Sequence, residues 1–335
     1  MNATEEATVS AAMAGDEAAF AQLVERHRGE LQVHAYRMLG SLEDAQDALQ
    51  ESFLRAWTGR ATYRWQSTFR AWLYRITTNA CLRILERRPR RLLPYDAGPA
   101  ARPGTRLLPP ADLPWLQPYP DLLLGESQDP EDAVVARETI ELAFLAAIQH
   151  LPPRQRAVLI LRDALDWSAN ETAAVLEMSV AAVNSALQRA RATMKKRLPA
   201  ARLEWAAATD AEDAERSLLQ TYMAAWERHD ASQLVALLRK DVRLAMPPHP
   251  TWYEGREAVA AFLTGVAFPP GSEPHHFVPT RANRQPAFGV YRGDRADARP
   301  FAVHLVEVKS GLVADMHFFL YPELFPTFGL PDRPR

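Results

Sequence analysis

A run of aromatic and arginine side chains between residues 63 and 75 has the chemistry of a surface for single-stranded nucleic acid. Aromatic rings stack on unpaired bases, and arginines between them neutralise phosphates. Tyr63 and Trp65 fit the apolar stripe of the following helix poorly, so we expect them to contact bases, whereas Phe69 and Trp72 are assigned to core packing. The candidate contacts to an opened strand are Tyr63, Trp65, Arg70, Arg75, Asn79 and Arg83.

A second basic segment has the spacing of a helix-turn-helix. Ser168 and Glu171 form a capping box that opens a short helix. Glu177 and Met178 make the turn without a glycine, and Ser179 caps the next helix. The outward face of that second helix is small and polar near its start and basic further along, which suits base edges first and phosphates later in a major groove. The candidate groove contacts are Ser179, Ala181, Asn184, Ser185, Gln188, Arg189, Arg191 and Lys195. An ordinary amphipathic helix of a bundle is the alternative.

The helix expected before the aromatic run starts at Ser41, which has an acidic residue three positions later. Its outer face carries carboxylates and an amide, and DNA would repel such a face. The face therefore indicates a protein-binding surface or, as the alternative, a solvated one. The candidate protein contacts are Asp44, Asp47, Gln50, Glu51, Phe53, Leu54 and Trp57.

The C-terminal third offers one pair of side chains for acid–base chemistry. Asp315 and His317 alternate on a predicted strand and so share one face, where a carboxylate and an imidazole could move protons. We favour a pocket that only binds, or a solvated face, because no second acid stands at a suitable spacing and a fold alone does not license an activity. The candidate pocket residues are Tyr222, Trp226, Trp252, His304, Asp315 and His317.

Composition excludes several classes of protein. The 335 residues carry a net charge of −2 and one cysteine, Cys81, which excludes a disulfide framework and a cysteine-based zinc site. Basic residues cluster in residues 61–106 and 151–202, with an acidic stretch between, as expected for two contacts with a polyanion. The polar N-terminus and the lack of a long apolar run predict a cytoplasmic chain without a membrane partner, and no metal or cofactor is expected.

Hydrophobic periodicity divides the chain into two all-α domains followed by an α+β domain. Ten prolines between residues 89 and 130 predict a semi-extended linker, whose interleaved apolar residues favour docking. The predicted parts are a helical bundle over 10–92, the linker over 93–130, the helix-turn-helix domain over 131–202 and the α+β domain over 211–331. In the last part we expect helices over 212–240 and 255–266 and strands over 242–246, 286–292, 300–308 and 312–320.

The two basic segments and the acidic helix resemble the extracytoplasmic-function sigma factors of the sigma-70 family. Residues 44–57 resemble region 2.2, which binds the clamp helices of the RNA polymerase β′ subunit. Residues 69–79 resemble regions 2.3 and 2.4, which melt and read the −10 element. Residues 151–161 and the helix-turn-helix resemble region 4, which reads the −35 element and touches the β-flap. The resemblance implies a transcription initiation factor whose proline-rich linker threads into the polymerase. Trp65, Thr77 and Glu177 depart from the usual pattern.

The last third is similar to the SnoaL-like branch of the NTF2-like superfamily. The residues that carry the similarity are 222–226, 246–248, 252–257 and 325–331. Such extensions occur in a subset of these sigma factors, including the mycobacterial sigma-G type, and the resemblance implies a regulatory domain with a possible small-molecule ligand. The alternative is a SnoaL-like isomerase, cyclase or hydrolase that carries a DNA-binding leader. Whether the extension activates or inhibits stays open.

Overall fold

The computed structural model describes residues 3–63, 68–124, 140–197 and 211–334. The chain forms two compact units that interleave along the sequence. The first unit contains Met1–Arg91 and Leu123–Leu203, and the second contains Leu92–Leu122 and Glu204–Arg335. Within the described residues, no helix is both long and apolar enough to cross a membrane.

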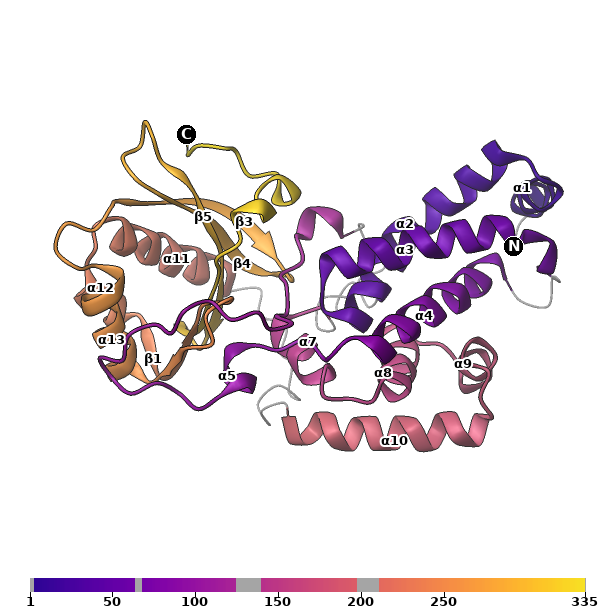
Figure 1. The fold of residues 1–335 in the computed structure, drawn as a ribbon, viewed down its shortest axis with the longest axis horizontal. Coiled ribbons are helices and arrows are strands. Elements are labelled where there is room, and N and C mark those ends of the chain that lie inside the picture. The colour runs from indigo at the N-terminus through magenta and orange to yellow at the C-terminus, as the bar shows by residue number, and fades with distance from the viewer. Residues whose placement is uncertain (1–2, 64–67, 125–139, 198–210, 335) are drawn as a thin grey trace. The chain divides into compact units, whose positions relative to one another are not determined.

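Side-chain caps define the helices of the N-terminal bundle. Asp16, Ser41 and Thr68 each accept a hydrogen bond from the backbone three residues later, which satisfies an orphan amide at a helix start. Ser41 therefore has the capping role that the sequence predicts. The helices are α1 (Ala3–Ala14), α2 (Glu17–Leu39), α3 (Leu42–Thr58), the short η1 (Arg60–Thr62) and α4 (Phe69–Arg87) (Figure 1).

The helix-turn-helix forms as predicted from its caps. Ser168 and Glu171 make the reciprocal capping box of α9, and the Ser179 hydroxyl accepts from the amide of Ala182. Glu177 adopts a left-handed conformation with φ 53° and ψ 48°, which costs a non-glycine residue some strain. The elements of this part are α7 (Leu142–Ile148), α8 (Pro153–Leu159), the π-helical η3 (Ile160–Ala164), α9 (Ala169–Leu176) and α10 (Val180–Arg197).

One buried arginine joins the N-terminal bundle to the helix-turn-helix part inside the first unit. Arg156 of α8 is 2% exposed and donates to the carbonyl of Met38 at the end of α2. The same guanidinium donates to Gln149 Oε1 at 2.7 Å, to the Gln149 carbonyl at 2.9 Å and to the Leu151 carbonyl at 3.3 Å. These hydrogen bonds offset the free-energy cost of burying the charge, and they hold α8 against α2.

The second unit is built on one six-stranded sheet, with α11 and α13 on one face. The strand order is β2-β1-β6-β5-β4-β3, so β2 and β3 are the edges. Helices α11 and α13 pack on the sheet over a core that includes Tyr222, Phe262 and Phe318 (Figure 1). The elements are α5 (Pro94–Ala97), η2 (Asp121–Leu123), α11 (Ala211–Glu227), α12 (Ala231–Ala236), β1 (Leu238–Ala245), β2 (Trp252–Glu254), α13 (Arg256–Phe262), η5 (Leu263–Ala267), β3 (His275–Ala282), β4 (Gln285–Arg292), β5 (Arg299–Lys309), β6 (Leu312–Phe319), η6 (Pro322–Leu324) and η7 (Pro326–Phe328).

Three sequence-based expectations for this unit were wrong. The helix expected through residue 240 gives way to β1, which starts at Leu238. The edge strands β2 and β3 were not predicted: β2 has three residues, and β3 contains Pro279. Proline is tolerated at a sheet edge, where its missing amide leaves no interior ladder bond unmade. A single-turn helix, α5, also forms in the linker.

The proline-rich segment docks on the α+β domain, as its apolar residues predict. Trp115, Leu116 and Tyr119 are buried, whereas Leu113 and Leu122 stay exposed. Ala101 bridges to Tyr253 on β2, and Pro120 bridges to Ala282 on β3. The segment therefore contacts both edges of the sheet. We call the surface that holds residues 92–122 the linker groove.

Candidate functional sites

The predicted groove-contact face of α10 is open to solvent. All eight candidates, Ser179, Ala181, Asn184, Ser185, Gln188, Arg189, Arg191 and Lys195, are exposed. Val183, Leu187, Ala190 and Met194 are buried on the opposite side. The periodicity therefore separated the two faces correctly, and the open face runs from small polar groups to cationic ones.

Arg191 has an intramolecular partner that the sequence did not indicate. Its guanidinium holds Asp163 of η3 through Nε at 3.0 Å and a terminal nitrogen at 2.7 Å. Arg191 remains largely exposed, so this ion pair competes with any phosphate for the same donors.

The two aromatic candidates for base contact have different outcomes. Tyr63 is 8% exposed and packs against Phe69 and Trp72, with ring centroids 6.2 and 5.4 Å away. The expectation of an available Tyr63 was therefore wrong, because η1 turns its ring back into the bundle. Trp65 lies outside the described residues. Arg75, Asn79 and Arg83 are partly exposed on α4, and Arg83 lies 3.5 Å from Glu51.

Arg70 is held in a polar cluster at the start of α4. A terminal nitrogen lies 2.6 Å from Glu30 Oε2, and the guanidinium lies over the rings of Tyr74 and Trp167 at 5.1 and 5.6 Å. Burial alone would raise the pKa of Glu30, but hydrogen bonds from His27 and Arg70 hold it at about 2. Trp167 directly precedes the cap of α9, so a residue of the helix-turn-helix part covers a candidate of the opened-strand surface.

The acidic face of α3 is partly as predicted. Asp47, Gln50 and Leu54 are exposed, and Leu54 is 64% accessible. Asp44 is not on this surface: it is 4% exposed and forms ion pairs with Arg88 and Arg91. The end of α4 and the residues after it cover Asp44, which a helical period cannot reveal.

The remaining candidates on α3 are partly exposed. Trp57 packs on Phe20 at 5.1 Å, and the Arg60 guanidinium lies 4.1 Å from its ring centroid. The Arg28 guanidinium lies over the Phe53 ring, 5.1 Å from its centroid, and a terminal nitrogen of Arg55 lies 2.6 Å from Glu51 Oε1. Glu51, Phe53 and Trp57 thus contact neighbouring side chains of the bundle and remain partly accessible to a partner.

The six pocket candidates of the C-terminal domain fall on two faces of the sheet. Tyr222 and Trp226 of α11 and His304 of β5 are buried between α11 and the sheet, where the Tyr222 hydroxyl is 2.8 Å from His304 Nε2. The imidazole stacks on Phe318 at 3.6 Å and hydrogen-bonds the His317 carbonyl through Nδ1. Burial lowers the pKa of His304 to about 3, so this histidine is neutral at physiological pH.

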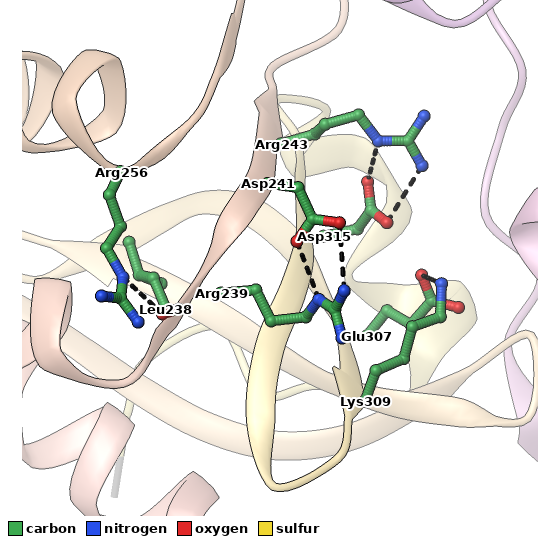
Figure 2. Close-up of polar contacts among 8 residues, drawn as sticks. All are labelled: Leu238, Arg239, Asp241, Arg243, Arg256, Glu307, Lys309 and Asp315. Atoms are coloured by element: carbon green, nitrogen blue, oxygen red, sulfur yellow. Dashed lines mark hydrogen bonds and ion pairs between the residues drawn. The ribbon is translucent and has the colours of Figure 1, made fainter.

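Asp315 and His317 lie on the opposite face, as the alternation of β6 predicts. Arg243 of β1 grips Asp315 with two bonds of 2.7 and 3.0 Å, as Figure 2 shows. Tyr95 of the linker covers this side, with its ring 4.9 Å from the Arg243 guanidinium and 6.2 Å from His317. Trp252 packs on Tyr95 at 6.0 Å and donates to the Gly98 carbonyl at 2.8 Å.

The structure therefore does not assemble the six residues into one acid–base pocket. The carboxylate of Asp315 is committed to an arginine, and His304 belongs to the other face. Within the described part of the chain, no group of three or more His, Cys, Asp or Glu side chains could hold a metal ion.

Three family models match the chain in the order of its parts. Sigma-70 region 2 matches residues 23–91, sigma-70 region 4 matches residues 141–194, and a SnoaL-like domain matches residues 219–316. The ECF RNA polymerase sigma factor SigG of Mycobacterium tuberculosis is 41% identical over 316 residues, which cover 93% of this chain and 84% of SigG. The chain belongs to the extracytoplasmic-function (ECF) sigma factors of RNA polymerase.

One further relative supports the same assignment, and one solved structure shares the fold. SigW of Bacillus subtilis is 32% identical over 185 residues, which cover 55% of this chain and 91% of SigW. The crystal structure of Mycobacterium tuberculosis SigJ shares the fold, with a TM-score of 0.59 and 23% identity over 93% of this chain and all of that one. The sigma-factor function is therefore favoured over the enzyme alternative.

Sequence reasoning missed three residues that organise this sigma factor. Arg156 lies in the region 4 motif at 151–161, but its burial depends on α2. Trp167 precedes a cap and gave no sign of contacting α4. Asn283 has φ 55°, and its Oδ1 accepts from the amide of Tyr119 at 2.8 Å. For Asn283, the one available signal was its residue type, because asparagine is favoured in turns.

Proposed function

We propose that the described faces divide the work of promoter recognition in this sigma factor. The exposed face of α10 reads the −35 element, and the surface of α4 with the residues before it opens and reads the −10 element. The exposed residues of α3 bind the β′ clamp helices of core polymerase, and region 4 also touches the β-flap. The exposure of all eight α10 candidates carries this proposal. Since polymerase and chromosome share the bacterial cytoplasm, the chain acts there.

Substitutions on α10 should separate base reading from phosphate attraction. Asn184→Ala or Gln188→Ala should change the preference at one or two −35 positions, by about 1–3 kcal/mol per position. Arg191→Ala should instead weaken binding for all sequences and lower the salt slope by about one. Run-off transcription from a panel of mutated −35 boxes, repeated at several salt concentrations, measures both effects. An unchanged preference in both Asn184→Ala and Gln188→Ala would show that α10 is not the reading helix.

Regions 2 and 4 must separate before both promoter elements are bound. B-DNA rises about 3.4 Å per base pair, so positions −35 and −10 lie about 85 Å apart. In the first unit, Trp167 next to α9 instead touches Arg70 and Tyr74 of α4, with the two rings 4.9 Å apart. We infer that this closed arrangement is a resting form, which polymerase opens.

We further propose that the SnoaL-like domain regulates initiation and catalyses no reaction. The bidentate Arg243–Asp315 pair supports this, because both carboxylate oxygens are already hydrogen-bonded to one guanidinium. The docked linker supports a regulatory role, because the segment that joins regions 2 and 4 is bound by this domain. A small-molecule ligand lacks a comparable argument.

Run-off transcription with purified core polymerase tests the regulatory proposal. We expect full-length protein and a form that ends after residue 204 to bind core polymerase but to differ several-fold in transcript yield from a cognate promoter. The truncation releases residues 92–122 from their groove, so region 4 gains freedom relative to region 2. Equal yields at equal core occupancy would refute a regulatory role for the domain.

A further inference from the structure

We propose that the linker groove is a peptide-recognition site, which binds a second, extended polypeptide segment with two spaced aromatic side chains when the linker leaves it. The inference rests on the proposed function in one respect, namely that the linker leaves the groove during initiation. The partner is defined by chemistry: an extended, proline-containing segment with aromatic anchors four residues apart, as in Trp115 and Tyr119 of the linker.

The domain binds the linker mainly through its backbone. Several side chains of the domain contact main-chain groups of the linker. Trp252 Nε1 donates to the Gly98 carbonyl at 2.8 Å, the Tyr253 hydroxyl to the Thr105 carbonyl at 2.7 Å, and His249 Nδ1 to the Leu108 carbonyl at 2.6 Å. Thr251 Oγ1 accepts from the Leu108 amide and Asn283 Oδ1 from the Tyr119 amide, each at 2.8 Å. Main-chain recognition of this kind tolerates many sequences, which is how protein modules bind extended peptides.

Main-chain to main-chain bonds at both sheet edges add to this binding. The amide of Ala101 donates to the Trp252 carbonyl on β2 at 2.8 Å, and the amide of Asn283 after β3 donates to the Tyr119 carbonyl at 2.8 Å. The Ala111 amide donates to Pro248 at 2.9 Å between these two points. When the linker leaves, these edge groups lose their partners, and an extended peptide can replace them.

Two aromatic side chains of the docked segment are buried, and they define the side chains that an occupant must supply. Trp115 and Tyr119 are 4% and 0% exposed, whereas Leu108 and Leu113 are 56% and 38% exposed on the outer side. At the end of the segment, Asp121 Oδ1 accepts from the amide of Arg284 at 2.7 Å. A segment that docks in the same way therefore buries two aromatic rings, accepts the Arg284 amide with one acid and leaves its outward positions exposed.

Thermodynamic linkage between peptide binding and linker release determines whether such a peptide raises or lowers transcription. The linker competes from the same chain at an effective concentration on the order of millimolar, so a separate peptide binds weakly to the closed form. A peptide that occupies the vacated groove stabilises the released linker, and polymerase binding must strengthen peptide binding by the same factor. A partner of this class is therefore an activator.

The test uses a fluorescein-labelled synthetic peptide of residues 111–122 and full-length protein. Fluorescence anisotropy should show at least tenfold tighter binding to the double variant Trp115→Ala/Tyr119→Ala than to the wild type, because the variant linker holds the groove poorly. The matched control, Leu113→Ala, alters an exposed side chain of the same segment and should behave as wild type. A peptide with alanine at both aromatic positions should not bind.

A third substitution locates the site. Adding Asn283→Gly to the double variant removes the amide that holds the Tyr119 backbone but keeps the left-handed turn that glycine accepts, so it should weaken peptide binding about tenfold while the melting temperature stays close to that of the double variant. Failure of the double variant to bind the peptide, or binding that Asn283→Gly does not weaken, overturns the proposal. The assay contains no polymerase, so its result is independent of whether the run-off experiment supports the proposed function.

Discussion

Replacing Arg156 by alanine is expected to destabilise the first unit by about 3–5 kcal/mol, the largest effect of any single substitution considered for this chain. The change removes the guanidinium donors that bind the carbonyls of Met38, Gln149 and Leu151, and those carbonyls stay buried. It also leaves a cavity where a long side chain was fully packed. Urea unfolding followed by circular dichroism measures the loss.

Arg154→Ala is the matched control for this prediction. Arg154 lies on the same helix, carries the same charge and is exposed. Its replacement should change the free energy of unfolding by no more than about 0.5 kcal/mol. Similar destabilisation in the two variants would mean that the charge of α8, and not the buried network of Arg156, matters for stability.

Acidification from pH 7.5 to pH 5.5 is expected to destabilise both units, and the second more than the first. Burial lowers the pKa of His34 to about 3, of His275 to about 4 and of His304 to about 3. A histidine whose folded pKa lies below its unfolded value stabilises the fold above the unfolded pKa, and this stability is lost as the pH falls toward the folded value. At pH 5.5, one unit below an unfolded pKa of about 6.5, each of these histidines lowers the free energy of unfolding by about 1.4 kcal/mol.

Hydrogen exchange followed by mass spectrometry can resolve the two units. His34 lies in the first unit, and His275 and His304 lie in the second. The free energy of unfolding should therefore fall by about 3 kcal/mol in the second unit and by about half of that in the first. His304→Phe should halve the loss in the second unit, since phenylalanine takes no proton. Protection that is independent of pH across this range would contradict the neutral burial of these histidines.

Local signals in the sequence were sufficient for most of the helices and for one candidate surface. Ser41, Ser168 and Glu171 predict helix starts, because a capping side chain and the backbone amide that it binds lie within three residues of each other. The exposed face of α10 follows from one helical period. The position of Asp315 and His317 on a common face follows in the same way from the alternation of a strand.

The errors concern residues whose environment is made by distant parts of the chain. Tyr63 was expected to be available, but Phe69 and Trp72 cover it. Asp44 was expected on an outer face, but Arg88 and Arg91 cover it. Periodicity shows which side of an element is polar and does not show which neighbour lies there. Likewise, the sequence suggested that the linker docks, but it did not indicate Asn283 as a docking point.

The second unit is assembled from two stretches of sequence that residues 123–203, which belong to the first unit, separate. A gene fragment that encodes only residues 204–335 would therefore produce a sheet with bare edges at β2 and β3, and bare edges invite pairing between molecules. Such a fragment would be prone to self-association and would be a poor stand-in for the domain in ligand screening or crystallisation. A faithful minimal version needs the strap of residues 92–122 restored, for example by circular permutation that joins it to residue 204 through a short flexible connector.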